Sequence, residues 1–142
     1  LFASSIHAVD GYPDDGPAIP ESAAPRPRNL YGASKAIGEA LGSVHAQQGR
    51  LSVIAIRIGW FADPTEEWYT RLRTDRFGRV ALMRDDFLAL VRACVALNPS
   101  VRFAVVHATS RVDPPRLGLN ETTALTGWAP SWVMSEVLSV RS

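Results

Sequence analysis

The segment LSVIAIRI, at residues 51–58, is the feature that most constrains how this chain can fold. It is rich in β-branched residues and shows little alternation between polar and apolar positions, which is typical of a strand buried on both faces. Strands of this kind occur in parallel sheets whose two faces are covered by helices. The segment therefore predicts an α/β layer fold with parallel strands.

Two further strands and two helices are expected around this segment. The opening run LFAS suggests a strand that ends near Ser4 or Ser5, and VRFAVVHA at residues 101–108 suggests a third strand. Helices are expected from about residue 30 to residue 48 and across residues 84–98. Because ligands bind beyond the carboxyl ends of the strands in open α/β sheets, we expect a site close to these ends.

Loops and short pieces complete the expected organisation. Residues 10–28 hold five of the ten prolines, a composition that breaks helices and strands and predicts a long surface loop. The stretch 59–83 is expected to be irregular, and the tail beyond residue 112 to hold short helical pieces. Asp85 and Asp86 are well placed against the N-terminal dipole of the second helix.

The first expected helix combines large apolar residues with glycines. Ile37, Leu41 and Val44 recur at helical spacing and form an apolar stripe. Gly38 and Gly42 lie inside the helix, after its start, and not in a turn that could cradle a phosphate. We interpret both glycines as positions of close packing.

Composition excludes several classes of protein. A chain of 142 residues with 46% hydrophobic and 20% charged residues suits one soluble globular domain. A net charge of +1 gives no reason to expect nucleic acid or an anionic membrane as a partner, and no run approaches the ~18 apolar residues that span a bilayer. The single cysteine, Cys94, lies in an apolar run and is expected to be a buried, inert thiol, so a reducing cytoplasm is the expected location.

One tyrosine and the chain's one lysine form the main candidate for chemistry. Tyr31 and Lys35 are one helical turn apart, so their side chains project from the same face. A nearby ammonium favours the phenolate and lowers the pKa of a tyrosine, which makes it a better base. The other fourteen basic residues are arginines, so a generic positive charge does not explain the lysine. A half-buried tyrosine beside a solvated lysine remains the plain structural alternative.

The wider pattern resembles the extended short-chain dehydrogenase/reductase family, which includes the NAD-dependent sugar epimerases and dehydratases. The matching features are a strand ending in Ser-Ser, Tyr-x-x-x-Lys opening a helix, and a buried strand with an arginine after that helix. The resemblance implies an α/β fold, the C-terminal half of a Rossmann-like doubly wound parallel sheet. Residues 1–112 would belong to the NAD(P)-binding domain with its catalytic helix, and residues 113–142 would form a small substrate-side segment.

The resemblance also implies roles for individual residues. Tyr31 would be the general base, and Lys35 would hold the cofactor ribose and lower the pKa of the phenol. Ser5 would hydrogen-bond the reacting oxygen, with Ser4 as the weaker candidate. Three further residues would lie along the nicotinamide of NAD or NADP: Ile58, Gly59 and Trp60.

The family's glycine-rich dinucleotide fingerprint does not occur in this sequence. The chain also opens on Leu1, in an apolar run that resembles a strand already in progress. In the family the fingerprint lies in the N-terminal half. We therefore expect that this chain is the second half of a longer enzyme and that by itself it does not bind NAD usefully.

Within the family, the sequence most resembles the uronate dehydrogenases, which oxidise a hexuronic acid with NAD. Ser5, Ile6 and His7 would contact the substrate, although uronate dehydrogenases tend to have an asparagine at the position of Ile6. A carboxylate is suited to bidentate binding by arginine, and among Arg71, Arg73 and Arg76 the last is favoured. A nucleotide-sugar epimerase or dehydratase, and a non-catalytic descendant acting as a binding module, remain alternatives.

Other ligands and partners are less well supported. The three histidines do not form metal-ligand spacings, so no metal is expected. Ser5, His7 and Asp10 are too close along one strand to form a hydrolase triad. Trp60 is the tryptophan expected near a ligand, whereas Trp128 is expected to anchor the tail. The resemblance implies a homodimer paired through the helix that bears the tyrosine and the lysine.

Overall fold

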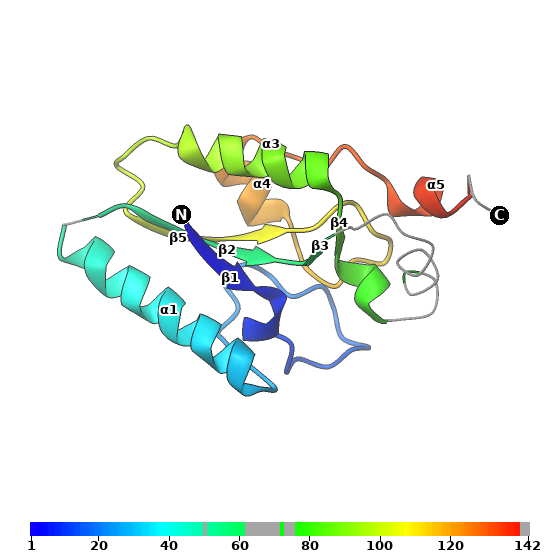
Figure 1. Ribbon diagram of the computed structural model, residues 1–142, viewed down its shortest axis with the longest axis horizontal. Coiled ribbons are helices and arrows are strands. Elements are labelled where there is room, and N and C mark those ends of the chain that lie inside the picture. The colour runs from blue at the N-terminus through cyan, green and yellow to red at the C-terminus, as the bar shows by residue number, and fades with distance from the viewer. Residues whose placement is uncertain (50, 62–71, 73–75, 140–142) are drawn as a thin grey trace.

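The computed structural model describes residues 1–49, 51–61, 72 and 76–139 of the chain. Its centre is a parallel sheet whose strand order is β1-β2-β5, so the segment that predicted the fold is the middle strand (Figure 1). The strands pair in register, with Ser5 opposite Ile58 and Arg57 opposite His107. The three strands are β1 (Phe2–Ser5), β2 (Val53–Ile58) and β5 (Phe103–Ala108).

Helices cover both faces of the sheet, as the sequence predicted. Helix α1 (Leu30–Gln47) lies on one face and α3 (Arg84–Val95) on the other, with α4 (Asn120–Thr126) beside α3 (Figure 1). On the α3 face, alternate strand residues pack with the helix in one hydrophobic cluster. The cluster contains Ile54, Ile56, Val106, Ala108, Leu90, Cys94 and Trp128. Burial raises the pKa of the Cys94 thiol, as expected for an inert cysteine.

Helix α1 approaches the sheet through small residues. A Cβ added at Gly38 would collide with the ring of Phe2, and one at Gly42 would lie 2.9 Å from Cγ1 of Val53, which confirms both glycines as close-packing positions. The apolar stripe faces away from the sheet, with Ile37 61% and Leu41 57% exposed. The helix therefore leaves its large apolar residues on the outside.

The stretch expected to be irregular holds regular structure at both ends. Two short strands, β3 (Trp60–Phe61) and β4 (Ala81–Leu82), pair in parallel, and a 3-10 turn, η2 (Arg76–Val80), leads into β4. The expectation was wrong at these ends because two-residue strands have no periodicity to detect. Ala81 and Leu82 are fully buried, so tertiary packing fixes them.

The tail is held to the start of α3 by a buried carboxylate. Asp86, expected only to face the helix dipole, is 1% exposed and accepts hydrogen bonds from the side chains of Ser110 at 2.6 Å and Ser131 at 2.8 Å. The segment then ends in α5 (Met134–Ser139), which confirms the short helices expected in the tail. No helix in the described part of the chain is long and apolar enough to span a bilayer.

A buried ion pair joins α1 to the middle strand. Arg57 of β2 is 1% exposed and binds Glu39 of α1 through Nε and Nη2, both at 2.9 Å. The same carboxylate accepts a 2.6 Å hydrogen bond from the hydroxyl of Ser4. The remaining guanidinium N–H groups bind the carbonyls of Glu21 and Ala23, so every donor of Arg57 has a partner.

The outer edge of β5 is closed by α4. The backbone N–H of His107 donates to Oγ1 of Thr122, and that hydroxyl donates to the buried carboxylate of Glu21. Nδ1 of His107 lies 2.9 Å from the carbonyl of Gly118, which can only accept, so Nδ1 carries the hydrogen. Burial lowers the pKa of His107 to about 4, against opposing effects of the Gly118 carbonyl and Glu21.

Substitution of Glu39 by alanine should strongly destabilise the fold. The change leaves the guanidinium of Arg57 buried without its counter-charge, a defect that costs about 3–5 kcal/mol. Urea denaturation should detect the loss. The double variant Glu39→Leu, Arg57→Met removes both charges and should recover most of it. A free energy of unfolding of Glu39→Ala within about 1 kcal/mol of the wild-type value would contradict a structural role for the pair.

The stability of the fold should depend on the protonation of His107. Its pKa is about 4 in the folded chain against 6.5 as a free side chain, so the unfolded state binds more protons between these values. The free energy of unfolding should therefore fall as the pH is lowered from 6.5 to 4, by at most about 3 kcal/mol from this residue. Denaturant titrations across this range should show a weaker pH dependence in His107→Gln than in wild type. The exposed-residue control His45→Gln should keep the wild-type slope, and equal slopes for all three proteins would refute the assignment.

Candidate active site

Ser5 stands at the carboxyl end of β1 and caps the turn that follows. Its Oγ accepts a 3.3 Å hydrogen bond from the backbone N–H of His7 in the 3-10 helix η1 (Ile6–Ala8). No acceptor for the hydroxyl hydrogen of Ser5 is found in the described part of the chain. The hydroxyl can therefore donate to a ligand oxygen. Ser4, the weaker candidate, instead points its hydroxyl at Glu39.

Tyr31 and Lys35 lie in the first turns of α1, beside β1. Asn29 caps this helix, because its side chain accepts a 2.7 Å hydrogen bond from the N–H of Gly32. Nζ of Lys35 lies 5.3 Å from the centre of the Tyr31 ring and donates to the carbonyl of Ala3 at 2.9 Å. Tyr31 is 54% exposed, so its phenol is open to solvent.

His7 connects the serine to the tyrosine. Its ring contacts the ring of Tyr31 edge-on, with ring centres 5.6 Å apart, and its backbone N–H donates to Oγ of Ser5. A Cβ added at Gly32 would collide with the carbonyl of His7, so the helix can start this close only with glycine there. The structure thus links Ser5 to Tyr31 through His7 and places Lys35 against Ala3, two residues before Ser5 in β1.

The other residues implied by the resemblance lie in different surroundings. Ile58 ends β2, and Gly59 follows in a tight space, where an added Cβ would lie 2.9 Å from the carbonyl of Ala108. Ile6 is 6% exposed and packs in a hydrophobic cluster, which Trp60 borders. The backbone of Arg76 begins η2, but its side chain lies outside the described residues. Arg71 and Arg73 lie wholly outside them.

The loop expected over residues 10–28 is present and is fixed by arginines that the sequence did not single out. Arg116 is 4% exposed and donates to the carbonyl of Tyr12 at 2.6 Å and to that of Pro13. Arg79 donates to the carbonyl of Asp14 at 2.6 Å. These contacts join the loop to η2 and to the segment before α4. Glu39 was also missed, although a buried arginine requires a partner and Glu39 lies one turn beyond Lys35.

The arrangement can bind hydroxyl groups. Within the described part of the chain, Lys35 uses one of its three ammonium hydrogens on Ala3, so two can serve a ligand. The exposed phenol of Tyr31 lies on the same side, so the pair fits the hydroxyls of a sugar or of a dinucleotide ribose. No group of histidine, cysteine and acidic residues in the described ranges has the geometry of a metal site.

Several known proteins are similar to this chain, although no protein-family model matches it. An L-arabinose 1-dehydrogenase (NAD(P)(+)) of Haloferax volcanii is 35% identical over 149 residues, which covers 92% of this chain and 57% of that enzyme. A uronate dehydrogenase of Agrobacterium fabrum is 32% identical over 133 residues, which covers 92% of this chain and 45% of that enzyme.

Comparison with solved structures also finds a uronate dehydrogenase. The crystal structure of uronate dehydrogenase from Agrobacterium tumefaciens matches 99% of this chain with a TM-score of 0.75 and 26% identity, over 50% of its own length. The chain thus spans about half the length of the curated relatives that it matches. The proteins similar to this chain are therefore members of the NAD-dependent epimerase/dehydratase family, with uronate dehydrogenases among them, as the sequence resemblance predicted.

Proposed function

We propose that this chain carries the catalytic half of an NAD-dependent oxidoreductase that acts on a sugar acid. One observation supports this above the others: His7 links Ser5, at the carboxyl end of a parallel strand, to Tyr31, and Lys35 beside Tyr31 binds the backbone of the same strand. An exposed phenol beside an ammonium and a free hydroxyl donor is an arrangement suited to removing a proton from an alcohol. The names of the relatives, which are sugar dehydrogenases, support the same reaction.

Each residue has a defined role in the proposal. The phenolate oxygen of Tyr31 accepts the proton of the substrate hydroxyl, and the ammonium of Lys35, 5.3 Å from the ring, stabilises the negative charge. Ser5 donates its hydroxyl hydrogen to the reacting oxygen and so orients it. Bound NAD, or NADP, supplies the hydride acceptor. Lys35 would hold its ribose, with Ile58, Gly59 and Trp60 along the nicotinamide.

The proposed substrate is a free uronate and not a nucleotide sugar. Nucleotide-sugar epimerases usually carry an asparagine shortly after the buried strand, and the sequence RIGWFADP has none. His7 and Ile6 adjoin Ser5, so they are the residues proposed to contact the sugar ring. Arg76 is the residue proposed to pair with the carboxylate. In this division residues 1–112 serve the cofactor and the chemistry, and residues 113–142 serve the substrate side.

The proposal includes a homodimer in the cytoplasm. The outward stripe on α1 supports pairing through this helix, because Leu30 is 89%, Ile37 61% and Leu41 57% exposed. Apolar residues repeated along one helix face are suited to packing against another helix. The buried, unpaired Cys94 is compatible with a reducing compartment.

The replacement Tyr31→Phe, in the protein that contains this chain, should lower kcat by about 10²–10⁴-fold, because it removes the general base. The ring and its contact with His7 remain, so the melting temperature should be unchanged. Turnover is followed by the absorbance of reduced cofactor with NAD and a panel of uronates and nucleotide sugars. Tyr12→Phe, which removes a phenol from the loop, should retain most of the activity.

The same assay separates the alternatives. Turnover of nucleotide sugars alone would replace the uronate assignment with an epimerase or dehydratase. If Tyr31→Phe has wild-type kcat, Tyr31 is not the base. Complete absence of turnover and of NAD binding in the wild-type protein would favour a non-catalytic descendant.

A further inference from the structure

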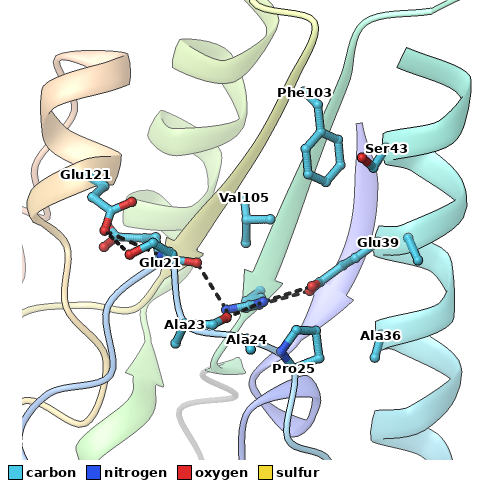
Figure 2. A pocket seen from close by; sticks show the side chains of 13 residues that line it. Glu21, Ala23, Ala24, Pro25, Ala36, Glu39, Ser43, Phe103, Val105 and Glu121 are labelled. Carbon is cyan, nitrogen blue, oxygen red and sulfur yellow. Dashed lines mark hydrogen bonds and ion pairs between the residues drawn. The ribbon is translucent and has the colours of Figure 1, made fainter. Parts of the chain in front are cut away.

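A cavity of about 420 Å³ lies on the α1 face of the sheet, apart from the candidate active site (Figure 2). It opens between α1, the strand β5 and the segment that follows Glu21. Tyr31, Lys35 and Ser5 are not among its lining residues. Its volume lies in the range of small-molecule sites, so the cavity can hold an organic ligand.

The walls of the cavity are mainly apolar and small. The side chains of Phe103 and Val105 come from β5, and that of Ala36 comes from α1 (Figure 2). Ala40 of the same helix also lines the cavity. The loop adds Ala23, Ala24 and Pro25. These surfaces fit an apolar body, and the ring of Phe103 offers an aromatic face to a cation.

The charges around the cavity are unbalanced. Among the described residues, the three acids Glu21, Glu39 and Glu121 and one base, Arg57, line the cavity, which gives these four groups a formal charge of −2. Arg57 is unavailable to a ligand, because Glu39 and backbone carbonyls occupy all its donors. An anionic ligand would therefore meet repulsion without a compensating cation.

The carboxylates of Glu21 and Glu121, on the α4 side of the cavity, accept hydrogen bonds from neutral groups. Glu21 accepts hydrogen bonds from Thr122, and Glu121 accepts them from Ser22 at 2.7 Å and 3.4 Å. Neither carboxylate has an ion pair within the ranges that the structure describes. Figure 2 shows both on one side of the cavity, across from Glu39 and Ser43.

We propose that this cavity is a second ligand site, specific for a small organic cation with an apolar body, such as an aryl-alkylammonium. The apolar walls accept the body, and Glu121 and Glu21 favour the ammonium group. The proposal does not depend on the catalytic role of Tyr31.

Three probes of nearly equal size test the charge preference: 2-phenylethylammonium, 2-phenylethanol and phenylacetate. Titration calorimetry or NMR should show that the ammonium binds at least about fivefold more tightly than the alcohol, and that the carboxylate binds weakest. Added salt should lower the affinity for 2-phenylethylammonium and leave the affinity for 2-phenylethanol unchanged. Equal affinity for all three probes, or no binding of the ammonium, would overturn the proposal.

Three variants locate the binding. Ala40→Phe fills the cavity from an exposed helix position and should abolish ammonium binding. Glu121→Gln keeps the shape and should reduce the preference for the ammonium over the alcohol. Asp85→Asn, a matched loss of charge at an exposed position on α3 across the sheet, should change nothing. Full ammonium affinity in Ala40→Phe, or an equal effect of Glu121→Gln and Asp85→Asn, would reject this location.

Discussion

The buried pair of Arg57 and Glu39 is the interaction on which the arrangement of the candidate site depends. It joins the middle strand to α1, and the hydroxyl of Ser4 adds the first strand to the same carboxylate. Burying two charges has a large desolvation cost, so the pair is a poor source of stability compared with apolar packing. Its main effect is on geometry. Because the contact is bidentate, it restricts both the rotation of α1 about its own axis and the position of the helix along the sheet.

That geometry reaches the candidate catalytic residues through the helical repeat. Tyr31, Lys35 and Glu39 are successive positions on one face of α1, each about one turn from the next. The first meets η1 through His7, the second binds the carbonyl of Ala3, and the third binds Arg57. A polar face directed at the sheet leaves the large apolar side chains of α1 to face outward.

The sequence was sufficient where the signal is local. The β-branched run of β2, the proline-rich loop and Gly49 at φ 73, just beyond the end of α1, follow from rules about single segments. Contacts between distant residues were missed, because Glu39 and Arg57 are eighteen residues apart and meet only when the helix packs on the sheet. For the same reason, the sequence did not determine whether the apolar stripe of α1 faces the sheet or the outside. Periodicity finds an apolar face, but it does not tell which side is covered.

The same ion pair also decides what the second cavity can bind. A buried arginine beside an apolar pocket would by itself suggest a site for an anion such as a carboxylate. Here Glu39 and backbone carbonyls occupy all the N–H donors of Arg57, and the carboxylate of Glu39 balances its positive charge. Among the described residues that line the cavity, Glu21 and Glu121 remain to set the sign of its charge. The contact that fixes the candidate catalytic face of α1 is therefore also the reason why the neighbouring pocket should select a cation.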